Sequence, residues 1–196
     1  MTIERIFLTP ESGGALIEFP HIRVLAGAGV EGDRYLNAMD EPGQNITLVE
    51  AEVIEAFNAD FGTRHELSCT RRNLVTRGVR LSLLVGKEFT VGSVRLRGVE
   101  LCEPCMGLGE AMATEGVTPA AVVKYLVHRA GIRADILSSG TITTGAELSS
   151  AANPSLRTSR MRGLRPRAGR RLACFVRPRK PSPRGTLIQV FGAAAR

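Results

Sequence analysis

Residues 86–105 read GKEFTVGSVRLRGVELCEPC. Apolar and polar side chains alternate over 88–91 and again over 94–101, on either side of Gly92–Ser93, which is typical of a β-hairpin with a tight turn. The second strand runs directly into Cys102, Pro104 and Cys105. This stretch therefore predicts a strand-rich fold in which a hairpin delivers two thiols to the end of a sheet.

The segments around this hairpin predict more strands than helices. A helix is expected after Thr118, with that residue as N-cap, Pro119 at the first helical position and Gly131 after its end. The other predicted elements are strands at 3–9 and 21–27, a strand followed by an amphipathic helix within 45–62, and two strands around Ser139–Gly140. Since there is no regular βαβ alternation, the sequence predicts a mainly β fold with a few helices, barrel-like or α+β.

The charge is divided sharply along the chain. Residues 1–150 contain 14 Lys and Arg against 19 Asp and Glu, whereas residues 151–196 contain 12 Lys and Arg and no acid. We therefore expect one domain over 1–150, followed by a basic, Arg- and Pro-rich tail over 151–196. The tail shows no helical or strand periodicity, so we expect it to be largely disordered.

No long apolar run suggests a membrane span, and the N-terminal residues lack the pattern of a signal peptide. The sequence thus favours a cytoplasmic protein without membrane contacts, and it makes no prediction of oligomeric state. In a reducing compartment, closely spaced cysteines more often serve metal binding or thiol chemistry than disulfides.

The Cys102–Cys105 pair is open to several interpretations. Structural zinc is disfavoured, because the remaining cysteines and the three histidines are isolated in the sequence. A thioredoxin-like redox couple would be expected after a βαβ unit rather than a hairpin. Cys102, at the end of a strand, could be an ordinary core residue, whereas Cys105 follows Pro104 in a turn and is expected to face a cleft.

Two short polar segments are candidates for binding an anion. One contains Arg71, Arg72 and Asn73, and the other contains Asp33 and Arg34 in a Gly-rich loop. Arginines beside an amide can hold a phosphate through forked, charge-assisted hydrogen bonds. The alternative is that these residues form an ordinary solvated surface.

Taken in order, four segments resemble a MOSC domain, the module named for the C-terminal part of molybdenum-cofactor sulfurases. They are GVEGDRY (29–35), QNITLVEAEVIEAF (44–57), the run from RRNLV to CEPC (71–105) and HRAGIRADILSSGTITTGAEL (128–148). The resemblance covers about residues 20–150. It implies a compact β-barrel like the barrel domain of pyruvate kinase, with a pocket for molybdenum cofactor (molybdopterin) or a related sulfur-bearing species.

The resemblance also implies roles for particular residues. Cys105, the cysteine after proline, matches the family's proposed sulfur carrier or molybdenum ligand. Arg72 and Asn73 match residues whose role would be to orient the pterin's phosphate or the loop beside the cysteine. Cys102 matches a position that is less uniformly cysteine in the family, so it is the weaker candidate for a metal ligand.

Two features depart from the family pattern: Gly145–Ala146 stands where a Gly-Asp pair is usual, and the Arg-rich tail has no counterpart. Pyridoxal phosphate binding is associated with the family as a whole, but nothing here resembles the desulfurase half that would bind it. The domain would therefore need a sulfur donor or a reductase as a partner in trans.

The function predicted from the sequence is that of a MOSC protein that binds molybdenum cofactor, carries sulfur on Cys105, or both. Three alternatives remain open at this point. They are a molybdenum-dependent reductase of N-hydroxylated compounds, a thioredoxin-like protein, and a protein that binds nucleic acid through its basic tail.

Overall fold

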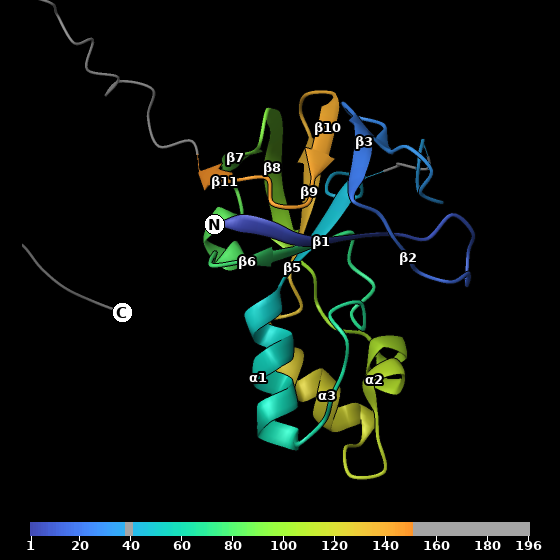
Figure 1. Ribbon diagram of the computed structural model, residues 1–196. Helices are drawn as coiled ribbons and strands as arrows, with labels where there is room; N and C mark the ends of the chain where they lie inside the picture. The colour runs from blue at the N-terminus through green and yellow to red at the C-terminus, as the bar shows by residue number, and fades with distance from the viewer. Residues whose placement is uncertain (38–40, 151–196) are drawn as a thin grey trace, which may run out of the picture. The chain divides into compact units, whose positions relative to one another are not determined.

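The structure is a computed structural model that describes residues 1–37 and 41–150. The predicted tail, which includes Cys174, lies outside the described residues. In Figure 1 the strands form the upper part of the described chain, and the three helices α1, α2 and α3 lie together below them.

One sheet has eight strands in the order β11-β7-β8-β9-β5-β6-β1-β2, and a second has three in the order β10-β3-β4. The strands of the first sheet are β1 (Thr2–Leu8), β2 (Ile17–Glu18), β5 (Ile46–Glu50), β6 (Leu74–Arg77), β7 (Glu88–Val91), β8 (Val94–Leu101), β9 (Ile132–Ile136) and β11 (Leu148–Ser150). Those of the second are β3 (His21–Leu25), β4 (Gly29–Val30) and β10 (Gly140–Thr143). The hairpin β7–β8 has the predicted bounds and turn.

The larger sheet curls until β11, at one end, reaches β1, the strand next to the other end. Leu148 donates its backbone N–H to Met1 O at 2.9 Å, and Ile3 donates to Ala146 O at 2.9 Å. These bonds join β1 to the segment that forms β11, so the barrel predicted from the sequence is confirmed. Its interior is apolar, with Phe89 and Leu96 among the side chains that are fully buried.

The helices form a second layer with a core of its own. They are α1 (Ala51–Phe61), α2 (Met106–Met112) and α3 (Pro119–Leu126), and a short 3₁₀ helix spans Leu81–Leu84. Thr118 caps α3 as predicted, because its hydroxyl accepts from Ala121 N at 3.2 Å. Phe57, Met112 and Leu126 meet in the apolar cluster between the helices.

The structure adds one strand pairing that the sequence did not predict, and it differs from the sequence-based expectation at the end of one helix. One βαβ unit is present, since β5 and β6 pair in parallel with α1 between them. The helix that begins after Thr118 ends at Leu126, before Gly131, and His128 then adopts a left-handed backbone with φ 61°. This turn sends the chain back to the sheet as β9.

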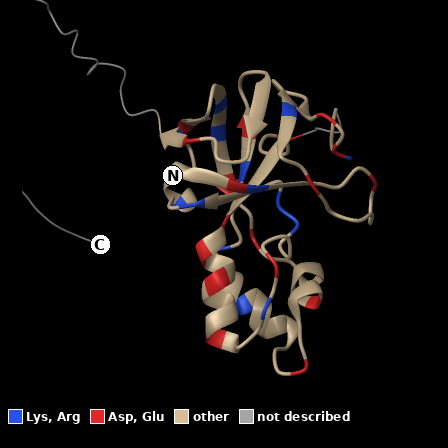
Figure 2. Ribbon diagram, viewed as in Figure 1, with Lys and Arg blue, Asp and Glu red and all other residues tan. Residues whose placement is uncertain are grey.

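Acidic residues occupy one exposed part of the domain. Figure 2 shows Asp and Glu spaced along α1, which contains Glu52, Glu55 and Asp60 and no Lys or Arg. Among the described residues, no helix is long and apolar enough to cross a membrane. The excess of negative charge predicted for the domain is thus partly gathered on one helix.

Candidate functional site

A polar pocket of about 280 Å³, which we call the arginine pocket, lies beside the ends of β1, β6 and β8. Six residues singled out from the sequence line it: Asp33, Arg34, Arg71, Arg72, Asn73 and Cys102. They come from three separate parts of the chain. Cys105 is not among the residues that line this pocket.

Sequence reasoning missed several other lining residues, namely Thr9, Tyr35, Gly43, Gln44, Asn45, Thr47 and Arg133. Arg133 adds a fourth guanidinium and is paired with Glu100 at 3.5 Å. Its only sequence signal was a cation at a polar position of the alternating strand IRADI. With four arginines against Asp33, the pocket carries a clear excess of positive charge.

The arginines are anchored through some of their donors and leave others available. Arg71 donates from one terminal nitrogen to Gly14 O at 2.9 Å, and its backbone is left-handed with φ 57°. Arg72 donates from Nε to Ala130 O at 3.1 Å. Because Nε of Arg72 is bound to the protein, its side chain is held in place while its two terminal nitrogens make no hydrogen bond to the described residues.

Asn73 is a structural anchor of this pocket rather than a free binding group. Its Oδ1 accepts from Thr47 N at 3.0 Å and from Thr47 Oγ1 at 2.9 Å, and its Nδ2 donates to Asp33 Oδ2 at 3.2 Å and Phe7 O at 3.4 Å. Asp33 also accepts from Tyr35 N at 3.0 Å. The amide of Asn73 thereby ties β1, β5 and the loop carrying Arg34 and Tyr35 together.

The two cysteines after β8 have different surroundings. Cys102 is 3% exposed, lines the arginine pocket, and donates its backbone N–H to Gly131 O at 2.8 Å. Cys105 is exposed and immediately precedes α2. The segment between them has no regular secondary structure and is not a hydrogen-bonded turn. One thiol therefore faces the pocket, and the other is open to solvent.

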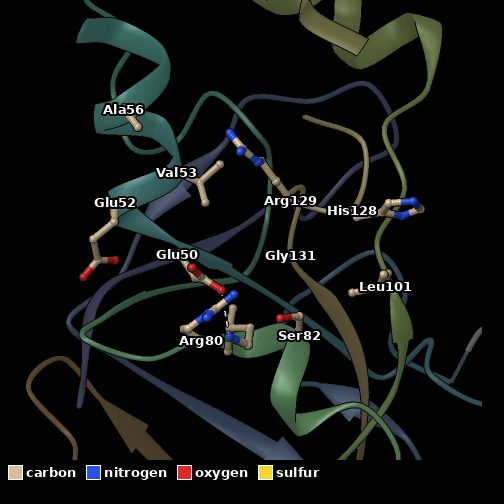
Figure 3. A pocket seen from close by; sticks show the side chains of 11 residues that line it. Glu50, Glu52, Val53, Ala56, Arg80, Ser82, Leu101, His128, Arg129 and Gly131 are labelled. Carbon is tan, nitrogen blue, oxygen red and sulfur yellow. Dashed lines mark hydrogen bonds between the residues drawn. The ribbon is translucent and has the colours of Figure 1, made fainter. Parts of the chain in front are cut away.

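Two other features lie outside this pocket. Burial raises the pKa of Cys69 to about 11, so this thiol is protonated at neutral pH. A second pocket of about 230 Å³ lies beside α1, where Glu50 accepts from Leu81 N at 2.7 Å (Figure 3). Within the described part of the chain, no group of three or more His, Cys, Asp or Glu side chains is arranged to hold a metal ion.

These thiol environments predict an order of reactivity at pH 7.5. In a Cys174→Ser variant, iodoacetamide is expected to label Cys105 fastest because it is exposed, and Cys69 slowest because its pKa is raised. Peptide mass spectrometry over a time course measures the three rates separately. Faster labelling of Cys102 than of Cys105 would contradict the sequence-based choice of Cys105 as the reactive thiol.

The barrel and its arginine pocket define a small β-barrel domain with a thiol at the wall of a cationic site. The family model described as MOSC domain matches residues 36–149. The chain therefore belongs to the MOSC domain family, as its motifs predicted, and this family is associated with molybdenum cofactor. No match was found among curated proteins.

Solved structures support the same fold. The YuaD protein from Bacillus subtilis superposes with a TM-score of 0.66 at 16% identity, covering 76% of this chain and 94% of that one. YiiM from Escherichia coli gives a TM-score of 0.54 at 16% identity, over 78% of this chain and 71% of that one. YiiM from Geobacillus stearothermophilus gives 0.57 at 14% identity, over 76% and 74%. At these identities the likeness establishes the fold alone.

Proposed function

We propose that this MOSC protein binds molybdenum cofactor in the arginine pocket, and that a cysteine of the Cys102–Cys105 loop ligates the metal or carries sulfur for it. The observation that carries this proposal is the convergence of Arg34, Arg71, Arg72 and Arg133 with a thiol in one pocket. The forked donors of arginine guanidinium groups suit a phosphate, and a cysteine thiolate suits a soft metal or a sulfane sulfur.

The residues present fit the group chemically. Arg72 is the strongest candidate for holding the phosphate, because its Nε is fixed to Ala130 O and its two terminal nitrogens remain as a fork. When bound, the cofactor would supply a metal centre for sulfur or oxygen transfer. Asn73 would act indirectly, since its amide is fully engaged with Thr47, Asp33 and Phe7.

The two thiols suit different forms of this chemistry. A metal ligand has to face the bound group, and Cys102 lines the pocket. A sulfur carrier has to be reached by a donor protein in trans, and Cys105 is exposed. We retain Cys105 as the proposed carrier and assign to Cys102 the position from which a metal could be ligated.

The proposal is tested by purifying the full chain from a host that makes molybdenum cofactor and from a matched host that does not. Molybdenum by mass spectrometry and pterin by fluorescence after oxidation should both approach one per chain in the first preparation only. Cys102→Ser and Cys105→Ser variants, purified in parallel, assign the ligand. Absence of both molybdenum and pterin from the first preparation would overturn the proposal.

Arg72→Ala is expected to weaken binding of inorganic phosphate by roughly tenfold to a hundredfold, since a charge-assisted hydrogen bond contributes about 1.5–3 kcal/mol. Isothermal titration calorimetry on the cofactor-free protein measures the loss. Arg72→Lys keeps the charge but not the forked geometry, so its phosphate affinity should lie between those of the parent chain and Arg72→Ala. Arg80→Ala is the matched control, because Arg80 is exposed and lines the other pocket. Unchanged affinity in Arg72→Ala would assign Arg72 to an ordinary solvated surface.

A further inference from the structure

The loop that carries both cysteines is tied to the turn after α3. Glu103, between the two thiols, accepts from His128 N at 3.1 Å through Oε2, and its Oε1 lies 2.6 Å from His128 Nδ1. A carboxylate can only accept, so Nδ1 carries the proton in this pair. The same turn accepts the backbone N–H of Cys102 through Gly131 O at 2.8 Å.

Other restraints on this loop are few. Pro104 has no N–H to donate, and Cys105 contributes its carbonyl to the first turn of α2, where it accepts from Gly109 N at 3.0 Å. The two ends of the loop are thus held by backbone bonds. Among the described residues, Glu103 makes the only side-chain hydrogen bonds that the loop forms, and both go to His128.

The backbone of His128 supports the same interpretation. Only Asn37, Arg71 and His128 have a positive φ among the described residues other than glycine, and at His128 the angle is 61°. A histidine rarely adopts this backbone conformation unless contacts with its surroundings hold it there. This conformation points the N–H of His128 at Glu103. In Figure 3, His128 and Leu101 lie on the same side of the second pocket, away from Glu50 and Glu52.

From these contacts we infer that His128, through Glu103, is the positioning residue of the cysteine loop, and that it keeps Cys102 in the arginine pocket and Cys105 outside it. Backbone bonds hold the two ends of segment 102–105, and the Glu103–His128 contact holds its middle. Without the Glu103–His128 contact, only these backbone bonds would restrain the loop, so the Cys102 thiol would be exposed to solvent more often. The inference rests on the proposed function, because the separate positions of the two thiols are useful only for the sulfur or metal chemistry proposed for them.

The test compares thiol labelling in four variants made in the full-length Cys174→Ser chain. His128→Gly removes the ring without adding strain, because glycine accommodates the positive φ, but it also makes the backbone more flexible. His128→Asn keeps a side-chain donor on a residue that tolerates this φ better than most. His21→Ala removes an exposed imidazole from β3, and Glu110→Gln removes an exposed carboxylate from α2, as matched controls.

Labelling of Cys102 is expected to accelerate by about twofold to fivefold in His128→Gly, because the Glu103–His128 pair is solvent-exposed and such pairs contribute only about 0.2–1 kcal/mol. His128→Asn should restore most of the protection, and both controls should match the parent chain. Thermal melting of each variant shows whether the fold is intact. Equal Cys102 rates in the parent, His128→Gly and His128→Asn would overturn the inference, as would acceleration that His128→Asn does not reverse.

The outcome is independent of cofactor content. Labelling is measured on cofactor-free protein, so a failure of the proposed function appears as missing molybdenum and pterin, whereas a failure of this inference appears as unchanged thiol rates.

Discussion

Gly131→Ala is expected to lose at least about 3 kcal/mol of unfolding free energy, the largest effect of any single substitution predicted here. A Cβ added at Gly131 would lie 1.9 Å from Leu48 O, in the middle of β5, and the residue has φ 96°. Leu48 belongs to β5 and Gly131 directly precedes β9, so neither backbone can move away at low cost. Urea unfolding followed by circular dichroism measures the change.

Two matched substitutions separate the causes. Gly62 ends α1 with φ 65° and has no atom within 4 Å of an added Cβ, so Gly62→Ala should lose only about 1 kcal/mol from the backbone angle. Gly116 has open space and no positive φ, so Gly116→Ala should be nearly neutral. A loss in Gly131→Ala no larger than that in Gly62→Ala would show that the approach to Leu48 is unimportant.

Asn73→Ala is expected to lose about 2–4 kcal/mol of unfolding free energy and also to weaken phosphate binding. The substitution removes the side-chain acceptor of Thr47 N and the amide donor that Phe7 O and Asp33 Oδ2 now share. It also frees the loop that carries Arg34 and Tyr35. Urea unfolding and calorimetric titration with inorganic phosphate measure the two effects.

Asn58→Ala is the control for that experiment. The amide of Asn58 makes a similar set of bonds, to Thr63 and His65 beyond the end of α1, and it lies outside the arginine pocket. We expect a comparable loss of stability with unchanged phosphate affinity at a temperature where both proteins are folded. If both variants lose affinity equally, the anchoring role of Asn73 is not specific to the pocket.

The local elements were predictable because they depend on neighbouring residues. The alternation around Gly92–Ser93 specifies a hairpin with the bounds of β7 and β8, and Thr118 with Pro119 specifies the start of α3. The end of that helix was less predictable, because the left-handed turn at His128 is held by Glu103 from another part of the chain. The βαβ unit of β5, α1 and β6 also escaped prediction, since pairing between strands leaves no local signal.

For the candidate site too, some features were predictable from neighbouring residues and others were not. Residue types alone indicated that Arg71, Arg72 and Asn73 could serve an anion and that the Cys102–Cys105 pair could serve thiol chemistry. Whether a side chain binds a ligand or holds the protein together depends on its partners, and those are distant in sequence. Asn73 meets Asp33 across 40 residues and Thr47 across 26 residues, which made it an anchor.

By itself the sequence determined that this chain is a mainly β MOSC protein, because family motifs and strand periodicity depend on short segments, and it indicated residues for a cationic, thiol-bearing site. Only the tertiary structure decided which residues share that site. The pairing order β8-β9-β5-β6 in the sheet brought Cys102 and Arg133 to the same pocket as Arg72, while Cys105 lies outside it. The direction in which a side chain points at the end of a strand is fixed by register and by contacts from other strands, and no local pattern records it.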